Sequence, residues 1–264
     1  MSRSPLSGLD HPAPGLLRLM TYNTHHGANR AGVLDLEAIA STVEACTPDV
    51  VALQEVDRHW GERSDHRDQP TWYAQRLGME LHYSANVVLP RPDASPPGEY
   101  GLALLSRLPI RTPQHLRYTG GRRTAEPRGL QTVLLGHPDP SATTRRLRVI
   151  NTHLSVTDGR LRRRQVAELL SYADADRDLP TAVAGDFNAG SRSAAVRAMR
   201  SVFTDAWDAG RGPKATMLGR RIDYLWLSRH LRPVRTTVVR SRASDHFAVV
   251  SDVAWASSPA SAST

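Results

Sequence analysis

The stretch TAVAGDFN, residues 181–188, is an apolar run that changes abruptly into a carboxylate and an amide. A short apolar run without polar alternation is typical of a strand that helices or a second sheet cover on both faces. Asp186 and Asn188 are costly to bury without partners, and both residue types bind metals or phosphates well. The stretch therefore predicts a buried strand of an α/β protein that ends in a functional group.

Runs of the same kind recur along the chain and predict a large sheet content: 16–22, 49–55, 101–106, 130–135, 147–154, 222–228, 234–240 and 247–253. Helices are predicted between some of them, at 35–46, 69–78, 159–173 and 190–200. In 159–173 the apolar residues follow the i, i+3, i+4, i+7 spacing of one helix face. We interpret the polar stretches 56–70, 90–99 and 111–128 as loops.

The composition of the 264 residues, 40% hydrophobic and 23% charged, is that of an ordinary globular protein. It excludes a collagen-like, coiled-coil or wholly disordered chain. No apolar run approaches the roughly 18 residues of a membrane-spanning helix, the first residues lack the apolar core of a secretion signal, and the single Cys46 cannot form an internal disulfide. We expect one cytoplasmic domain at 15–255, monomeric by default and without stable membrane insertion, with flexible tails at 1–14 and 256–264.

The formal net charge is +8, and Lys214 is the only lysine beside many arginines. Such a strong preference for arginine over lysine points to a biased genomic composition. We therefore do not interpret the positive charge as evidence for nucleic-acid binding. Arginine does suit phosphate, which it binds with two parallel hydrogen bonds. The charge is therefore compatible with any phosphorylated or anionic partner.

Other predicted strands also begin or end in polar residues: Asn23, Glu55, His153, Asp223 and the triplet Ser244, Asp245 and His246. Polar groups at the mouths of a packed sheet meet in one crevice. Taken singly, Asn23 also fits a turn, Glu55 a solvated loop and His153 a satisfied strand histidine. Asp223 shares a strand face with Leu225 and Leu227 and needs a partner there. The combination predicts one functional site.

Seven segments in this order resemble the endonuclease/exonuclease/phosphatase superfamily: YNTHHG (22–27), ALQEVD (52–57), YGLALLSRLPI (100–110), INTHLS (150–155), AGDFNAG (184–190), RIDYLWLS (221–228) and ASDHFAV (243–249). The resemblance spans residues 18 to 253. It implies an α/β fold that is a four-layer sandwich: two mixed, mostly antiparallel sheets packed face to face, helices outside, and the site at one end.

The resemblance also implies a metal-dependent phosphoric ester hydrolase. Carboxylate and amide oxygens suit Mg²⁺, with Mn²⁺ as the alternative, better than zinc. Glu55 and Asn23 match the metal-binding positions of the family, and Asp245 is a further candidate ligand.

For the chemical step, Asp186 is the candidate to orient or deprotonate the attacking water, and Asn188 to hold that water or a phosphoryl oxygen. A protonated His246 would donate to the phosphate while Asp223 holds its ring. His153 would contact the phosphate or protonate the leaving group. Arg128, ahead of a strand in EPRGL, is a candidate phosphate or substrate contact, with a surface arginine as the alternative.

Two features depart from the abasic-site endonucleases of the family, which usually carry an acidic residue at position 25 and tyrosine at position 153, where this chain has His25 and His153. AGDFNAG and RRIDYLW also lack the signatures of the inositol 5-phosphatases. The loop residues His59, Asp65, His66 and Asp68 would allow a second metal site, but we favour a solvated loop that borders the substrate. Arg122 and Arg123 similarly fit a solvated turn better than a phosphate-binding segment.

Three hypotheses follow. The first, which we favour, is a phosphodiesterase or phosphatase that acts on a small molecule or a lipid headgroup. The second is a DNA or RNA nuclease, whose binding would weaken steeply with salt. The third is a non-catalytic binding module, which the cost of keeping unused buried carboxylates argues against.

Overall fold

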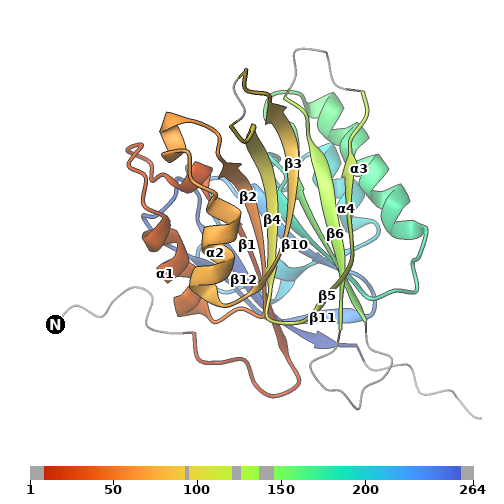
Figure 1. Ribbon diagram of the computed structural model, residues 1–264. Coiled ribbons are helices and arrows are strands. Elements are labelled where there is room, and N and C mark those ends of the chain that lie inside the picture. Colours follow the sequence, from red (N-terminus) through yellow and green to blue (C-terminus); the bar gives the residue numbers. More distant parts are fainter. Residues whose placement is uncertain (1–8, 93–94, 121–125, 137–145, 257–264) are drawn as a thin grey trace, which may run out of the picture.

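The computed structural model describes residues 9–92, 95–120, 126–136 and 146–256, which form two six-stranded sheets packed face to face (Figure 1). The first sheet has the order β11 (Leu231–Val239), β12 (Ala248–Trp255), β1 (Leu17–Asn23), β2 (Val50–Arg58), β4 (Gly98–Ser106) and β3 (Glu80–Leu89). The second has the order β5 (Ile110–Arg117), β6 (Gly129–Leu135), β7 (Leu147–His153), β8 (Thr181–Asp186), β10 (Asp223–Leu227) and β9 (Thr204–Asp205).

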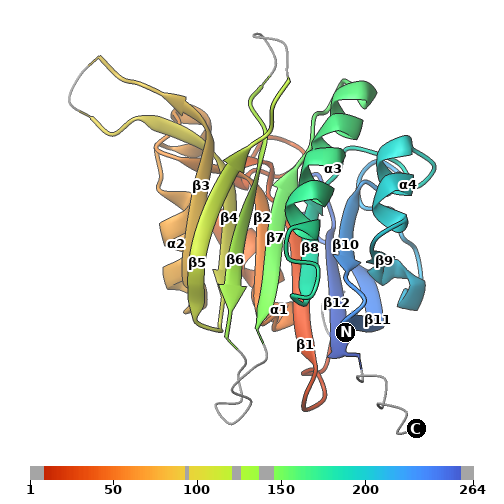
Figure 2. The same cartoon turned by 90° about the vertical axis from the view of Figure 1, so that its right-hand side faces the viewer.

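Helices cover both outer faces of this pair of sheets. The helices are α1 (Leu36–Cys46), α2 (Gln69–Leu77), α3 (Gly159–Asp174) and α4 (Ala194–Arg200), with short 3-10 turns η1 (His25–Gly27), η2 (Glu62–Ser64) and η3 (Ala206–Ala209). In Figure 1 α1 and α2 lie on one side of the sheets and α3 on the other, and in Figure 2 α3 and α4 lie over β8 and β10. The predicted four-layer α/β sandwich is confirmed.

Side-chain alternation along the strands produces the layers. In β1, Leu17 and Leu19 pack between the two sheets, whereas Met20 and Tyr22 pack against α1 and α2. In the second sheet Ala182 and Ala184 of β8 face the first sheet, and Val183 packs against α3 and α4. Because both faces of the central strands are buried, their sequences are mostly apolar.

Two parallel strand pairs determine which edge carries the site. β1 pairs with β2 and β7 pairs with β8 in parallel, and the connections run through α1 and α3; the other pairs are antiparallel. Asp35 and Asp158 cap the N-termini of these two helices with their carboxylates. The carboxyl ends of β1, β7 and β8 consequently lie at one edge of the sandwich.

One predicted loop is wrong. Within 111–128, residues up to Arg117 belong to β5, which pairs with β6 at the edge of the second sheet. The strand is largely exposed and contains Pro113 between the paired residues Arg111 and Gln114, where the register shifts. Proline and polar residues are tolerated at a bulged edge, so the strand lacks the apolar pattern of its neighbours.

The other predicted loops are shorter than expected. Residues 56–58 extend β2, Gln69 and Pro70 begin α2, and 98–99 begin β4. β3 and β9 were not predicted from the sequence, because β3 is only partly buried and mixes polar with apolar residues. Of the predicted tails, residues 1–8 and 257–264 lie outside the described residues, and so do Gly121, Arg122 and Arg123. None of the described helices is long and apolar enough to cross a membrane.

A substitution at Gly185 tests the tight contact between β7 and β8. A Cβ atom there would lie 2.0 Å from the carbonyl oxygen of Thr152, and the backbone φ of Gly185 is +153°. We expect Gly185→Ala to lower the free energy of unfolding by about 1–3 kcal/mol, measured by urea denaturation. Gly190→Ala is the matched control, because no atom lies within 4 Å of its Cβ position. Equal denaturation midpoints would contradict the prediction.

Candidate active site

The space between the sheets turns polar at the edge where β1, β7 and β8 end. Asn23, His153 and Asp186 are the last residues of these strands, and each is at most 1% exposed. Asp223 begins β10 and pairs with Asp186 across the antiparallel register. Since these residues continue the inward-facing positions of their strands, they point between the sheets and converge, as the sequence predicted.

Glu55 reaches this cluster through an irregularity in β2. The register between β2 and β4 shifts between Gln54 and Val56, and Glu55 between them has a left-handed φ of 59°. Val56 returns to the core beneath α1 and α2. A β-bulge of this kind changes the direction of one side chain and leaves the next residues in place. Glu55 therefore does not follow the inward–outward alternation of β2.

Asn23 connects the carboxylates. Its Nδ2 donates to Glu55 Oε1 at 2.9 Å and to Asp186 Oδ2 at 3.1 Å, while its Oδ1 accepts the backbone N–H of His25 at 3.0 Å. The last contact fixes the orientation of the amide. Asn23 thus presents a nitrogen to the two carboxylates, and in this arrangement it positions them; its predicted role as a metal ligand stays a prediction.

Asp186 lies next to a second buried carboxylate, that of Asp223. Burial and the neighbouring Asp223 raise the pKa of Asp186, against the lowering effect of His246, of the Asn188 N–H and of Asn23. The Asn188 N–H donates to Asp186 Oδ1 at 2.8 Å. A carboxyl group with a raised pKa is better able to accept a proton from a bound water.

His246 and Asp223 form a buried pair. His246 Nδ1 lies 3.0 Å from Asp223 Oδ2. Burial disfavours the imidazolium, but Asp223, with smaller contributions from Asp186 and Asp245, raises the pKa of His246 to about 10. Ser244 holds the loop, because its Oγ donates to the Asn23 carbonyl and accepts the His246 N–H. The predicted pairing of the two residues is therefore present, with His246 charged at neutral pH.

His153, unlike His246, has positively charged neighbours. Arg128 Nη1 donates to His153 Nδ1 at 2.5 Å, and Arg128 also pairs with Glu126 at 3.0 Å. Burial, Arg128 and His246 lower the pKa of His153 well below its usual value. The imidazole is consequently neutral, with its proton on Nε2. The guanidinium of Arg128 is turned toward His153 and Glu126, a role that the sequence did not predict.

Asn188 completes this side of the site. It adopts a left-handed φ of 47°, its Nδ2 donates to the Leu154 carbonyl at 3.1 Å, and the same nitrogen lies 3.0 Å from His153 Nε2. With the His153 proton on Nε2, both residues present N–H groups. Two adjacent donors of this kind suit the oxygen of a phosphoryl group.

Among the described residues, two groups of three side chains could hold a metal ion. Glu55, His153 and Asp186 form one, and Asp186, Asp223 and His246 the other; within each group the ligand atoms lie within 4.8 Å of one another. With His153 protonated on Nε2 and His246 charged, the carboxylate oxygens of these groups are the ligands open to an ion. Asp245 belongs to neither, and its Oδ1 lies 4.0 Å from His25 Nδ1. Neither group includes a residue of the 56–70 loop, where the sequence would allow a second metal site at His59, Asp65, His66 and Asp68.

A cavity of about 610 Å³ opens beside Glu55. Its lining includes Trp60 and Arg63 of the 56–70 loop, together with Tyr100, Glu126 and Arg128. The loop thus borders the space next to Glu55, as its position in the sequence predicted. Glu126 was missed, although its place two residues before Arg128 was a usable signal; Trp60 and Tyr100 carry no signal in the sequence.

Comparison with known proteins places this geometry in a family. The chain matches the model of the Endonuclease/Exonuclease/phosphatase family over residues 20–246. A comparison with curated protein sequences gives no match. Among solved structures, an endonuclease/exonuclease/phosphatase from Beutenbergia cavernae is 26% identical with a TM-score of 0.76, over 93% of this chain and 73% of that one.

Two further structures share the fold. The human Nocturnin catalytic domain, solved with a bound sulfate anion, is 24% identical with a TM-score of 0.71, over 94% of this chain and 95% of that one. A mannosyl-6-phosphatase from Bacteroides thetaiotaomicron is 18% identical with a TM-score of 0.71, over 90% of this chain and 100% of that one. Because the family model covers most of the chain, the protein belongs to the endonuclease/exonuclease/phosphatase family, whose members are phosphoesterases and nucleases.

Proposed function

We propose that the protein is a hydrolase of phosphoric esters that depends on Mg²⁺ or Mn²⁺ and acts on a small molecule or a lipid headgroup. The observation that carries the proposal is the convergence of Glu55, Asp186 and Asp223 with His153 and His246 at one edge of the sandwich. Carboxylates packed this closely repel one another, and a divalent cation compensates that repulsion.

The donor set fits such a cation. Burial and Asp223 raise the pKa of Asp186, which indicates that this carboxylate lacks a full counter-charge. Glu55, which Asn23 holds beside Asp186, offers the carboxylate oxygens that Mg²⁺ prefers, and one or two carboxylates suffice for this ion. When bound, the cation would neutralise charge on the phosphoryl oxygens and on the leaving oxygen.

The protein's own residues account for the remaining requirements of hydrolysis. Asp186 accepts a proton from the attacking water, and its position is fixed by the Asn188 N–H and by Asn23. Neutral His153 and Asn188 donate hydrogen bonds to a phosphoryl oxygen. His246, charged through its contact with Asp223, stabilises negative charge that develops on the phosphoryl or leaving oxygen.

Removal of the metal and of Asp186 tests the proposal directly. With a panel of nucleotides, sugar phosphates, inositol phosphates, phospholipids and nucleic acids, we expect EDTA to abolish hydrolysis and Mg²⁺ or Mn²⁺ to restore it. Asp186→Asn should lower kcat by about 10²–10⁴-fold, the usual contribution of a positioned base. Asp178→Asn, at an exposed carboxylate, is the matched control. Hydrolysis that survives EDTA, or an Asp186→Asn variant with full activity, would reject the proposal.

Metal binding has a second readout in stability. A cation that binds only the folded state raises the melting temperature as its concentration rises. We expect Mg²⁺ to stabilise the wild-type protein and to stabilise Glu55→Gln distinctly less, measured by thermal denaturation over a Mg²⁺ titration. Equal Mg²⁺-induced shifts in the two proteins would show that Glu55 does not hold the ion.

The pH profile tests the pair of Asp223 and His246. His246 has to stay protonated, so the alkaline limb of the activity profile should lie where the pH rises through its pKa of about 10. In Asp223→Asn burial remains and the main stabilising charge is lost, so this limb of the kcat/KM profile should move down by about 2 pH units or more. An unchanged alkaline limb would exclude His246 as the group that titrates.

A further inference from the structure

A second cavity flanks the proposed active site on the side away from Glu55. It has a volume of about 460 Å³, and its lining includes Arg30, Leu218, Arg242, Asp245 and Phe247. We call it cavity B, and the cavity beside Glu55 cavity A. His25 lines cavity A, and its Nδ1 lies 4.0 Å from Oδ1 of Asp245 in cavity B. The two cavities therefore approach each other at His25 and Asp245.

His25 and Asp245, where the two cavities approach each other, are directly connected to residues of the proposed active site. Asp245 precedes His246, and His25 donates its backbone N–H to Asn23 Oδ1. Ser244, which also lines cavity B, donates to the Asn23 carbonyl. Cavity A is lined by Glu55 and cavity B by Ser244 and Asp245, the residues directly before His246. A phosphorus atom held between Glu55 and His246 would then lie between the two cavities.

The charge of the site favours a substrate with a single negative charge. Glu55, Asp186 and Asp223 outnumber His246, and Arg128 is already paired with Glu126. One divalent cation brings this cluster close to neutrality and leaves little positive charge for a phosphomonoester, whose second ionisation has a pKa of about 6. A phosphodiester carries one charge only.

Cavity B has the chemistry of a subsite for an organic group. Leu218 is 61% exposed and holds a left-handed φ of 46°, a conformation that is an outlier for a bulky side chain. The ring of Phe247 lines the same cavity. Arg30 and Arg242 have no hydrogen-bond or ion-pair partner among the described residues, so their guanidinium groups are available to a polar or anionic part of a ligand.

On the basis of the proposed function, we propose that the protein hydrolyses phosphodiesters and not phosphomonoesters, with one ester arm in cavity A and the other in cavity B. Leu218, Arg30 and Arg242 then form the subsite for the second arm. In the reaction the oxygen of water bonds to phosphorus, one P–O ester bond breaks, and the proton of the water ends on the departing alcohol. The products are a phosphomonoester, which is not cleaved further, and an alcohol.

Bis(4-nitrophenyl) phosphate and 4-nitrophenyl phosphate test this preference with Mg²⁺ present. We expect the diester to release one equivalent of 4-nitrophenol, not two, and the monoester to react at least about 10-fold more slowly in kcat/KM. A monoester cleaved as fast as the diester, or two equivalents released, would overturn the inference and leave the proposed function standing. If neither probe nor any member of the wider panel were hydrolysed, the proposed function itself would fail, and the inference with it.

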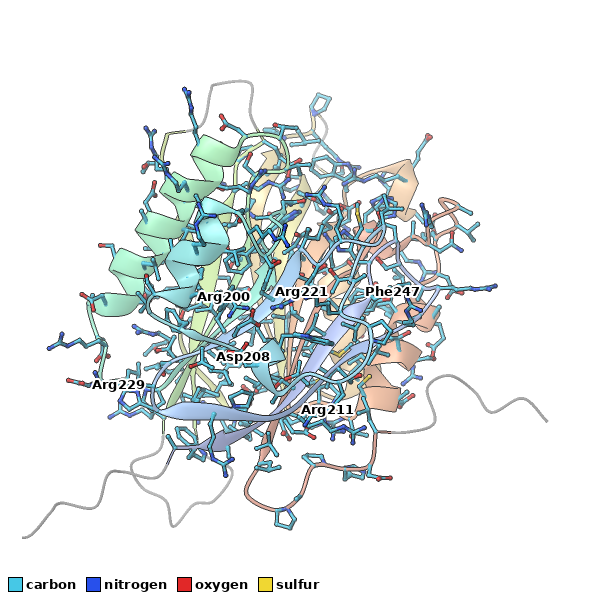
Figure 3. The ribbon with its side chains drawn as sticks, turned by 180° about the vertical axis from the view of Figure 1, so that it is seen from behind. Arg200, Asp208, Arg211, Arg221, Arg229 and Phe247 are labelled. Atoms are coloured by element: carbon cyan, nitrogen blue, oxygen red, sulfur yellow. The ribbon has the colours of Figure 1, made fainter. Side chains whose placement is uncertain are left out.

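Variants of cavity B test the subsite. Leu218→Asn suits the left-handed backbone and removes the apolar contact, and Arg242→Ala removes a guanidinium group. We expect each to lower kcat/KM for the diester by about 10-fold, mainly through KM, with an unchanged melting temperature. Arg229→Ala is the control, because Arg229 is exposed and lies on the opposite side of the molecule from Phe247 in Figure 3. Unchanged kinetics in both cavity B variants would overturn the assignment.

Discussion

Three carboxylates buried or half-buried at one end of the inter-sheet core are the constraint on which the rest of the site depends. Each is held by a specific donor: Asn23 donates to Glu55 and to Asp186, and His246 pairs with Asp223. Buried charges without such partners would cost several kcal/mol each. Asn23 ends β1 and His246 precedes β12 in the first sheet, whereas Asp186 and Asp223 belong to β8 and β10 of the second, so these contacts form only when the two sheets pack against each other.

The same constraint accounts for the irregular backbone next to the carboxylates. Glu55, Asn188, His25 and His26 all adopt left-handed conformations, which are uncommon for residues other than glycine. They lie around the carboxylates, whereas the strands beneath them follow regular alternation. Such conformations cost of order 1–3 kcal/mol each and persist only where the surroundings impose them. Here the apolar core between the sheets supplies a rigid support, and the strained residues aim the functional groups.

The sequence predicted those parts of the protein that local patterns determine. The predicted strand 181–186 is β8 to the residue, and Asp223, which shares a face with Leu225 and Leu227, has the buried partner that its position required. Glu55 was identified by its place in a motif, but its bulge was not, because a register shift depends on the partner strand. The direction of the Arg128 guanidinium and the orientation of the Asn23 amide were likewise set by tertiary neighbours.

The two histidines show most clearly why the roles needed the structure. His153 ends a buried strand and His246 precedes one. Both lie within 4 Å of the same carboxylate, since His153 Nε2 is 3.5 Å and His246 Nε2 3.9 Å from Asp186 Oδ2. Their other nitrogens meet opposite charges: Arg128 faces His153, and Asp223 faces His246. One imidazole is therefore neutral and the other charged. A neutral ring can donate a hydrogen bond but carries no net charge, which is why we propose that His153 binds a phosphoryl oxygen and that His246 compensates charge.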